Sequence, residues 1–145
     1  MKIKNIISYL EEITPLCYQE SYDNSGLLVG DKESEATSVL IALDCTEEIL
    51  EEAINNKCNL VITHHPLIFS KLSKITGSNH TERIIIRAIK HDISIYAIHT
   101  NLDNIYYGVN HRISQRLGLI NTEILSYKNN ILMQLVLYAP KKNTE

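Results

Sequence analysis

The chain has 145 residues, 44% of them hydrophobic and 21% charged, which is typical of a globular domain large enough to bury a core. The formal net charge of -3 excludes a strong electrostatic footprint for a nucleic-acid backbone. No apolar stretch approaches the roughly 20 residues that span a bilayer. Cys17, Cys45 and Cys58 are odd in number and lack paired spacing, which indicates free thiols in a reducing compartment. We therefore expect a cytoplasmic protein.

The first half of the chain alternates between helical and strand patterns. Apolar residues recur at helical spacing through the first dozen residues, which predicts an amphipathic helix. A polar turn at residues 23–26 precedes the apolar stretch at residues 27–29. Residues 39–43 form a continuous apolar run, the pattern of a strand buried on both faces. Thr46 then has the character of a helix N-cap, and two glutamates follow it in the first turn.

The second half repeats this cycle. Residues 60–62 are predicted as a second buried strand, and Thr81 is predicted to cap the helix that follows. Residues 93–98 are the third strand. Residues 108–117 have the pattern of another helix, with Gly118 as its C-cap. Residues 132–138 are a candidate fourth strand.

Strands separated by helices predict βαβ units. The expected fold is therefore α/β, with a mostly parallel sheet flanked by helices. We assign residues 1–140 to one α/β lobe and residues 141–145 to a polar tail.

Polar side chains follow each of the three predicted strands directly. Asp44 follows the first, His64 and His65 follow the second, and His99 and Asp103 follow the third. The carboxyl ends of parallel strands meet at one edge of a sheet, where ligands bind. Imidazole and carboxylate groups are ligands for zinc, iron, nickel or manganese. The sequence thus predicts a metal site at this edge.

The adjacent histidines favour two metal ions over one. Successive side chains of a strand point to opposite faces. At a strand end, where Pro66 restricts His65 to an extended or turn geometry, both rings can splay toward neighbouring ions. Two metals about 3.5–4 Å apart can together activate water and polarise a substrate.

Simpler interpretations compete with a site for several residues. A histidine at a strand end is more often a hydrogen-bonded structural residue than a ligand. Asp23 and Asn24 fit a turn in which side chains cap their own backbone, and Asp44 fits a helix start. Cys45 fits a small buried thiol. For the remaining histidines we expect solvated positions on helices or caps: His80, His91 and His111.

Five ordered motifs carry a family resemblance over essentially the whole chain. They are SYDNSGLLVG at residues 21–30, LDCT at 43–46, THHPLIF at 63–69, HTNLD at 99–103, and GVN at 108–110 with LGL at 117–119. The sequence resembles the GTP cyclohydrolase I type 2 or Nif-three-like family. Tyr22 stands where that family more often has tryptophan.

The resemblance implies two divalent metal ions, such as zinc, iron or manganese, and a ring-shaped homohexamer. It places the amino-terminal metal ligands on His64, His65 and Asp103. Residues expected to support these ligands or to face a substrate are His99, Asp44, Asn101, Asp23 and Asn24. The family continues into a second lobe whose histidine and glutamate complete the site. We therefore expect the site of this chain to be incomplete.

The expected function is that of a metal-dependent hydrolase acting on a small or nucleotide-like substrate. The resemblance leaves catalysis itself open, because fold and family do not establish a reaction. No phosphate-binding P-loop motif is present in the sequence. The alternatives are a non-catalytic metal-binding scaffold with a regulatory role and an inactive fragment of a longer protein. Neither a nucleic-acid nor a membrane partner is indicated.

Overall fold

The computed structural model of the protein describes residues 1–127 and 133–138. Helices and strands alternate through most of this part of the chain. A short 3-10 turn, Leu16–Tyr18, lies between the first helix and the first strand. The elements are α1 (Ile3–Ile13), β1 (Gly26–Val29), β2 (Val39–Ala42), α2 (Glu47–Asn55), β3 (Leu60–Thr63), α3 (His80–Lys90), β4 (Ser94–Ala97), α4 (Thr100–Asp103) and α5 (Val109–Leu117).

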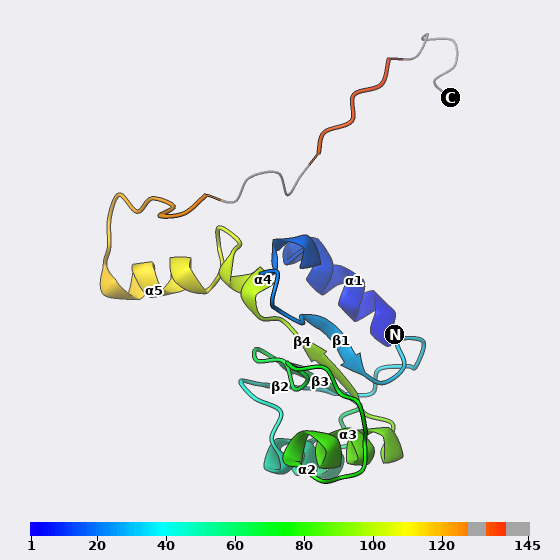
Figure 1. The fold of residues 1–145 in the computed structure, drawn as a ribbon. Helices are drawn as coiled ribbons and strands as arrows, with labels where there is room; N and C mark the ends of the chain where they lie inside the picture. Colours follow the sequence, from blue (N-terminus) through cyan, green and yellow to red (C-terminus); the bar gives the residue numbers. More distant parts are fainter. Residues whose placement is uncertain (128–132, 139–145) are drawn as a thin grey trace.

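The four strands form one sheet in the order β1-β4-β3-β2. Strand β3 pairs in parallel with both β2 and β4, and β1 pairs antiparallel to β4 with a register shift between Leu27 and Val29. Helices α2 and α3 cover one face of this sheet, and α1 covers the other (Figure 1). The predicted α/β class with a mostly parallel, helix-flanked sheet is confirmed.

The core has one layer on each face of the sheet. On the α2 and α3 side, Val61 and Ile95 of the central strands are fully buried among the helix residues. On the α1 side, Leu60 and Tyr96 pack against Ile3 of α1, and all three are fully buried. Successive side chains of one strand therefore pack into opposite core layers, because side chains alternate between the two faces of a strand. This double burial fixes the central strands whose ends carry the candidate site.

The prediction that residues 39–43 are buried on both faces was wrong. Strand β2 forms as expected, but Val39 is 40% exposed and Ile41 is 77% exposed. The reason is its position at the edge of the sheet, because the core layer on the α1 side contains residues of β1, β3 and β4 and none of β2. Only Leu40 of this strand packs against the core on the α2 side.

Two predicted helix boundaries are confirmed and one was wrong. The Thr46 side chain accepts the Ile49 amide hydrogen at the start of α2, and Gly118 closes α5 in the left-handed conformation with φ 68°. Helix α3 starts earlier than predicted, because Asn79 and not Thr81 is its N-cap. Asn79 Oδ1 accepts from the Glu82 backbone amide, and Asn79 Nδ2 donates to the Glu82 carboxylate. The second bond differs from that of a capping box, because it comes from the side chain of the N-cap residue and not from its backbone amide.

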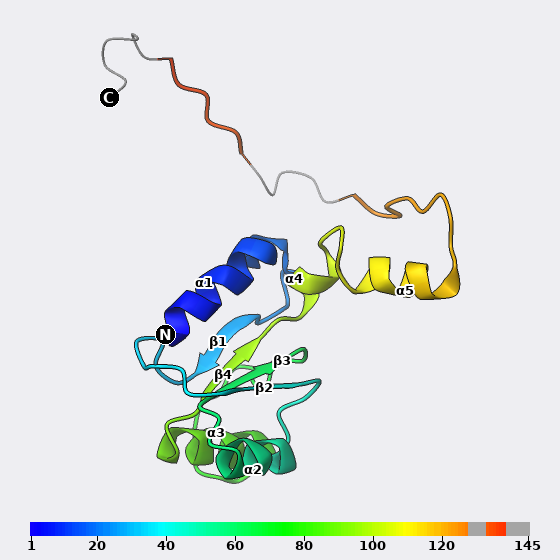
Figure 2. The ribbon, with the colours of Figure 1, turned by 180° about the vertical axis from the view of Figure 1, so that it is seen from behind.

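Helix α5 and the described residues after it, 118–127 and 133–138, lie outside the layered core. In both ribbon views α5 extends away from the sheet (Figures 1 and 2), and none of its residues is buried. The predicted fourth strand at 132–138 was wrong for residues 133–138, which form no strand and are exposed. Leu132 and the tail at 141–145 lie outside the described residues. The layered core therefore consists of residues up to the end of α4.

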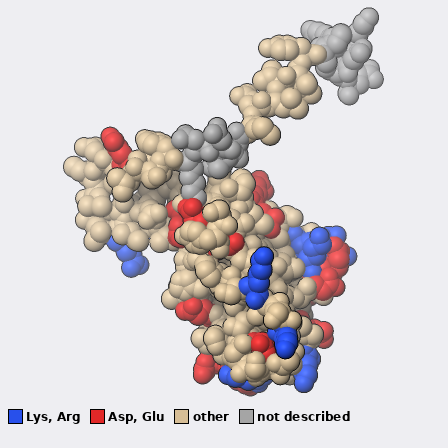
Figure 3. Space-filling model, viewed as in Figure 1, with Lys and Arg blue, Asp and Glu red and all other residues tan. Residues whose placement is uncertain are grey.

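Charged side chains of both signs are interspersed over the described surface in the view of Figure 3. Acidic and basic groups pair near the amino terminus, where Lys2 and Lys4 both contact Glu33. Among the described residues, the structure contains no helix with the length and apolar character that crossing a membrane requires.

Candidate metal centre

Three histidines from two neighbouring strand ends meet in one cluster. His64 and His65 directly follow β3, and His99 follows β4 and precedes α4. One ring nitrogen from each of the three lies within 4.8 Å of the others. The ring centroids of His64 and His65 are 5.0 Å apart, and those of His64 and His99 are 5.2 Å apart. The parallel pairing of β3 with β4 produces this convergence.

The backbone after β3 explains how two adjacent histidines face one cluster. The amides of His64 and His65 both donate to the Leu43 carbonyl, at 3.2 and 3.0 Å. The Thr63 hydroxyl donates to the His65 carbonyl at 2.8 Å. These bonds bend the chain out of the strand, so the alternation of faces ends. The two rings then lie at 51° to each other.

A buried carboxylate holds His99 in place. Asp23 Oδ1 lies 2.8 Å from His99 Nδ1, and the Asp23 side chain has no exposed area. The same carboxylate accepts hydrogen bonds from the amide and hydroxyl of Thr100 and from the hydroxyl of Ser25. Burial alone would raise the pKa of Asp23, but the hydrogen bonds from Thr100 and His99 outweigh it and hold that pKa well below its ordinary value.

Asp103 lies beside the cluster at the end of α4. Its Oδ1 atom is 3.9 Å from His64 Nε2, and the two side chains are 31% and 23% exposed. Helix α4 turns the chain directly after β4, so this carboxylate returns to the sheet edge. The structure thus brings Asp103, His64 and His65 to the same edge.

Each of the three histidine rings is oriented by a hydrogen bond at its Nδ1 atom. His64 Nδ1 lies 2.9 Å from the Ile98 carbonyl, His65 Nδ1 lies 2.8 Å from Asp44, and His99 Nδ1 is bonded to Asp23. An acceptor on Nδ1 fixes the proton there and leaves Nε2 with a free lone pair. Metal-binding histidines commonly have this arrangement. Three imidazoles and a carboxylate form a donor set that fits a divalent transition metal.

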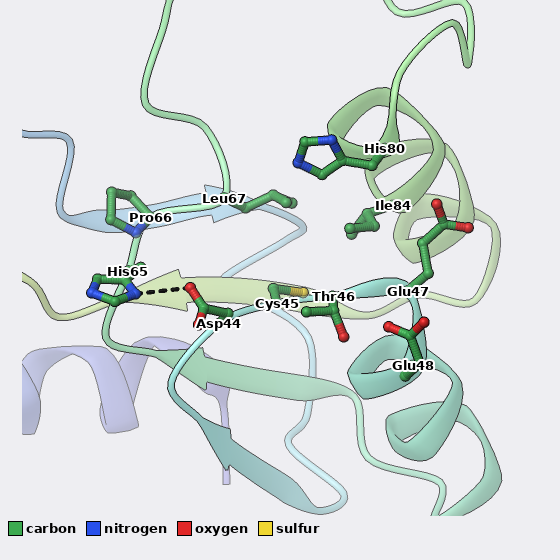
Figure 4. A pocket seen from close by; sticks show the side chains of 10 residues that line it. All are labelled: Asp44, Cys45, Thr46, Glu47, Glu48, His65, Pro66, Leu67, His80 and Ile84. Atoms are coloured by element: carbon green, nitrogen blue, oxygen red, sulfur yellow. Dashed lines mark hydrogen bonds and ion pairs between the residues drawn. The ribbon is translucent and has the colours of Figure 1, made fainter.

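A third carboxylate, Asp44, lies in an open cleft of about 570 Å³. Its pair with His65 is exposed, with side-chain exposures of 53% for Asp44 and 47% for His65. Figure 4 shows this pair on one wall, with His80 of α3 on the opposite wall. Three carboxylates line the cleft, from Asp44, Glu47 and Glu48, and its lining contains no lysine or arginine.

The remaining predicted site residues have supporting positions. Asn101 is fully buried, where its side chain accepts from the His99 amide and donates to the Thr14 carbonyl. It therefore braces the His99 backbone and faces no substrate. Asn24 is exposed, and its side-chain amide donates to the Ile68 carbonyl at 2.6 Å. That bond joins the loop before β1 to the loop after His65.

The structure adds residues that the sequence reasoning did not assign to the site. His80 is exposed at the start of α3, as predicted, and it also lines the cleft beside His65. Phe69 lies at the end of the THHPLIF motif, and its ring is 6.4 Å from that of His99. Its place in the same motif as His64 and His65 was the available signal. Cys45 is buried as predicted, and burial raises the pKa of its thiol to about 11.

Comparisons with known proteins agree on one family. The family described as Duf34/NIF3 (NGG1p interacting factor 3) matches residues 1–144. A protein of Clostridium acetobutylicum named GTP cyclohydrolase 1 type 2 homolog is 41% identical over 90% of this chain and 48% of its own length. A Staphylococcus aureus protein of the same name is 41% identical over 99% of this chain and 39% of its own length.

Solved structures show the same fold. A Bacillus cereus protein related to NIF3 superposes with a TM-score of 0.81 at 43% identity, covering 87% of this chain and 35% of that one. Reduced HcgD from Methanocaldococcus jannaschii superposes with a TM-score of 0.80 at 31% identity, covering 87% of this chain and 50% of that one. The chain thus spans about half or less of the length of these relatives. It belongs to the Duf34/NIF3 family, as the sequence motifs predicted.

Proposed function

We propose that this member of the Duf34/NIF3 family binds divalent metal through His64, His65 and Asp103 and supports hydrolysis of a small or nucleotide-like substrate. His99 offers a further ring nitrogen to the same ions. The observation that carries the proposal is the common orientation of the three imidazoles. Each has Nδ1 on an acceptor, and one nitrogen of each points into a cluster within 4.8 Å.

The chemistry of the cluster supports a metal better than a purely structural role. A structural histidine satisfies its nitrogens with protein partners, whereas here one ring nitrogen from each of three histidines lies within 4.8 Å of the others. Ions bound there would activate water and polarise a substrate bond. The protein's own contribution is to fix the rings through Ile98, Asp44 and Asp23 and to present an open cleft beside His65.

The name GTP cyclohydrolase 1 type 2 homolog belongs to relatives that are about twice as long or longer. For this chain, a nucleotide-like substrate is therefore proposed and not established. The two-metal site, the ring-shaped hexamer and a cytoplasmic location stay predictions in the same way.

The test is metal content of the purified chain after equilibrium dialysis against zinc, compared with a His64→Ala/His65→Ala variant. We expect the double variant to lose the bound zinc and to keep cooperative urea unfolding, because the core lies in the sheet layers and not in the cluster. His91→Ala is the matched control, since His91 ends α3 and lies outside the cluster. Unchanged zinc content in the double variant would refute the metal site.

Hydrolysis is tested separately, with zinc- or manganese-loaded protein and a nucleoside triphosphate as substrate. Turnover that disappears in the double variant supports the enzymatic part of the proposal. Metal binding without turnover leaves the non-catalytic scaffold as the function of this chain.

A further inference from the structure

Two exposed aromatic rings stand beside the histidine cluster without any role in the centre described above. Tyr22 is 65% exposed and Phe69 is 53% exposed. Their ring centroids lie 6.4 Å apart with an angle of 56° between the ring planes. Single apolar side chains are common on protein surfaces, but these two contact each other and are held next to a candidate site.

Phe69 links the exposed ring of Tyr22 to the cluster. Its centroid lies 6.4 Å from that of His99, with the two rings at 80°. The His99 ring in turn lies 5.2 Å from His64 and 5.6 Å from His65. We call Tyr22, Phe69 and His99 the aromatic row. It leads from the surface to the ring nitrogens of the candidate centre.

The two loops that carry the row are fixed to each other. Tyr22 directly precedes Asp23, whose enclosed carboxylate bonds to His99 and Thr100. Asn24 donates to the Ile68 carbonyl, one residue before Phe69. A surface that is ordered before binding loses less conformational entropy when a ligand arrives. Exposed rings on braced loops are therefore suited to hold a ligand.

The charges around the cluster indicate which part of a ligand the protein would recognise. The neighbouring cleft is lined by three carboxylates and by no lysine or arginine. The lining of this cleft offers a phosphate group no cationic side chain, and Arg83 beside it is already paired with the lining residue Glu47. Uncharged contacts are therefore what the protein itself can supply for recognition. Stacking of a nucleobase on an aromatic side chain is such an uncharged contact, because every base has a π-face.

We propose that Tyr22 and Phe69 form a stacking platform for a planar heteroaromatic ring of the substrate. This inference rests on the proposed function, because it places the ring at one end of the aromatic row and the reacting group at the metal centre. Tyr22 and Phe69, which are not metal ligands, would then contact the substrate. The protein would recognise the ring of the substrate and not its phosphate.

The experiment uses a tryptophan reporter on the platform itself. The sequence contains no tryptophan, so a Tyr22→Trp variant carries a single indole while keeping an aromatic ring at this position. Guanosine is titrated against this variant without added metal, and ribose serves as the sugar-only probe. We expect saturable quenching of the indole fluorescence by guanosine and no quenching by ribose.

A second substitution tests the role of Phe69. Phe69→Leu in the Tyr22→Trp background keeps an apolar side chain and removes the ring, so guanosine affinity should fall about tenfold. Tyr9→Leu is the matched control, because Tyr9 is 63% exposed on α1 and contacts no ring of the row. Guanosine affinity should be unchanged there. Both positions are exposed, so neither variant should lose its fold.

Three titration results would each overturn the platform. They are absence of guanosine quenching, equal quenching by ribose, and guanosine affinity that Phe69→Leu leaves unchanged. An indole emission that shifts with protein concentration alone would also overturn it, by showing that a second copy of the chain covers the rings. Zinc binding by the Tyr22→Trp protein, in which Phe69 is intact, is measured in parallel. Zinc binding without guanosine binding in that protein refutes the platform alone, whereas guanosine binding without any zinc binding refutes the metal site alone.

Discussion

Two carboxylate–histidine pairs flank the candidate centre with the same bond in different surroundings. The Oδ1–Nδ1 distance is 2.8 Å in both the Asp23–His99 and the Asp44–His65 pair. The first pair is enclosed, with exposures of 0% for Asp23 and 18% for His99, whereas the Asp44–His65 pair is 53% and 47% exposed. The Oδ1–Nδ1 distance therefore does not by itself show how much each pair contributes to stability or to the site.

The surroundings decide what each pair does. The Asp23 carboxylate joins the loop before β1 to the end of β4 through several donors, so it belongs to the fold as much as to the site. The Asp44 carboxylate bonds to His65 at an exposed position, so its main effect is on the His65 ring. We conclude that the enclosed side organises the centre and the open side is available to ligands.

The largest effect should follow from removing the enclosed carboxylate. Asp23→Ala leaves the Thr100 amide and His99 Nδ1 without their acceptor, so the free energy of unfolding should fall by about 3 kcal/mol. Urea unfolding followed by circular dichroism measures this change. Asp44→Ala is the matched control, with an expected change within about 0.5 kcal/mol. Equal destabilisation by both variants would contradict the comparison.

A second enclosed carboxylate extends the comparison to pH. Hydrogen bonds from Thr76 and Ser78 lower the pKa of Glu82 to about 2. Since the folded state favours the ionised form, this stabilisation is complete above the unfolded pKa of ~4.3 and disappears as the pH falls toward 2. Glu82→Gln should therefore lower stability at neutral pH and reduce its loss in acid. The urea midpoint of unfolding is measured as a function of pH for both proteins. A midpoint that falls equally steeply in acid for the variant and the wild type would contradict this prediction.

The open pair should show a smaller effect, seen in metal affinity and not in folding. Asp44→Ala frees the His65 ring to turn, so zinc affinity should fall about tenfold, as for other carboxylates that orient metal-binding histidines. Competition with a chromophoric chelator measures the affinity. Unchanged zinc affinity would mean that Asp44 does not orient a metal ligand.

The parts of the fold that could be predicted from sequence are those with local causes. The apolar runs of β3 and β4, the Thr46 cap and the Gly118 C-cap are each specified within a few residues. The exposure of Ile41 was not predictable in this way, because an apolar run does not say whether its strand is central or at an edge. The position of the α3 cap was missed since Thr81 and Asn79 both have the right chemistry.

The candidate site divides in the same manner. The convergence of His64, His65 and Asp103 at one edge followed from their places after parallel strands. The Asp23–His99 bond joins residues 76 positions apart in the sequence, and motif similarity suggested only that Asp23 supports the site. The depth of its burial, the bracing role of Asn101 and the ring contact of Phe69 depend on tertiary packing. None of these has a local signal in the chain.

We propose that the histidine cluster binds metal through the ring nitrogens that have no acceptor on the protein. Long-range ¹H–¹⁵N correlation of the histidine side chains, recorded with and without zinc, detects this binding at each ring nitrogen. We expect protonated Nδ1 atoms in His64 and His65, a zinc-dependent shift of their Nε2 signals, and unchanged spectra for His80, His91 and His111. Zinc-dependent shifts confined to those last three histidines, or unaltered Nε2 signals of His64 and His65 at saturating zinc, would contradict it.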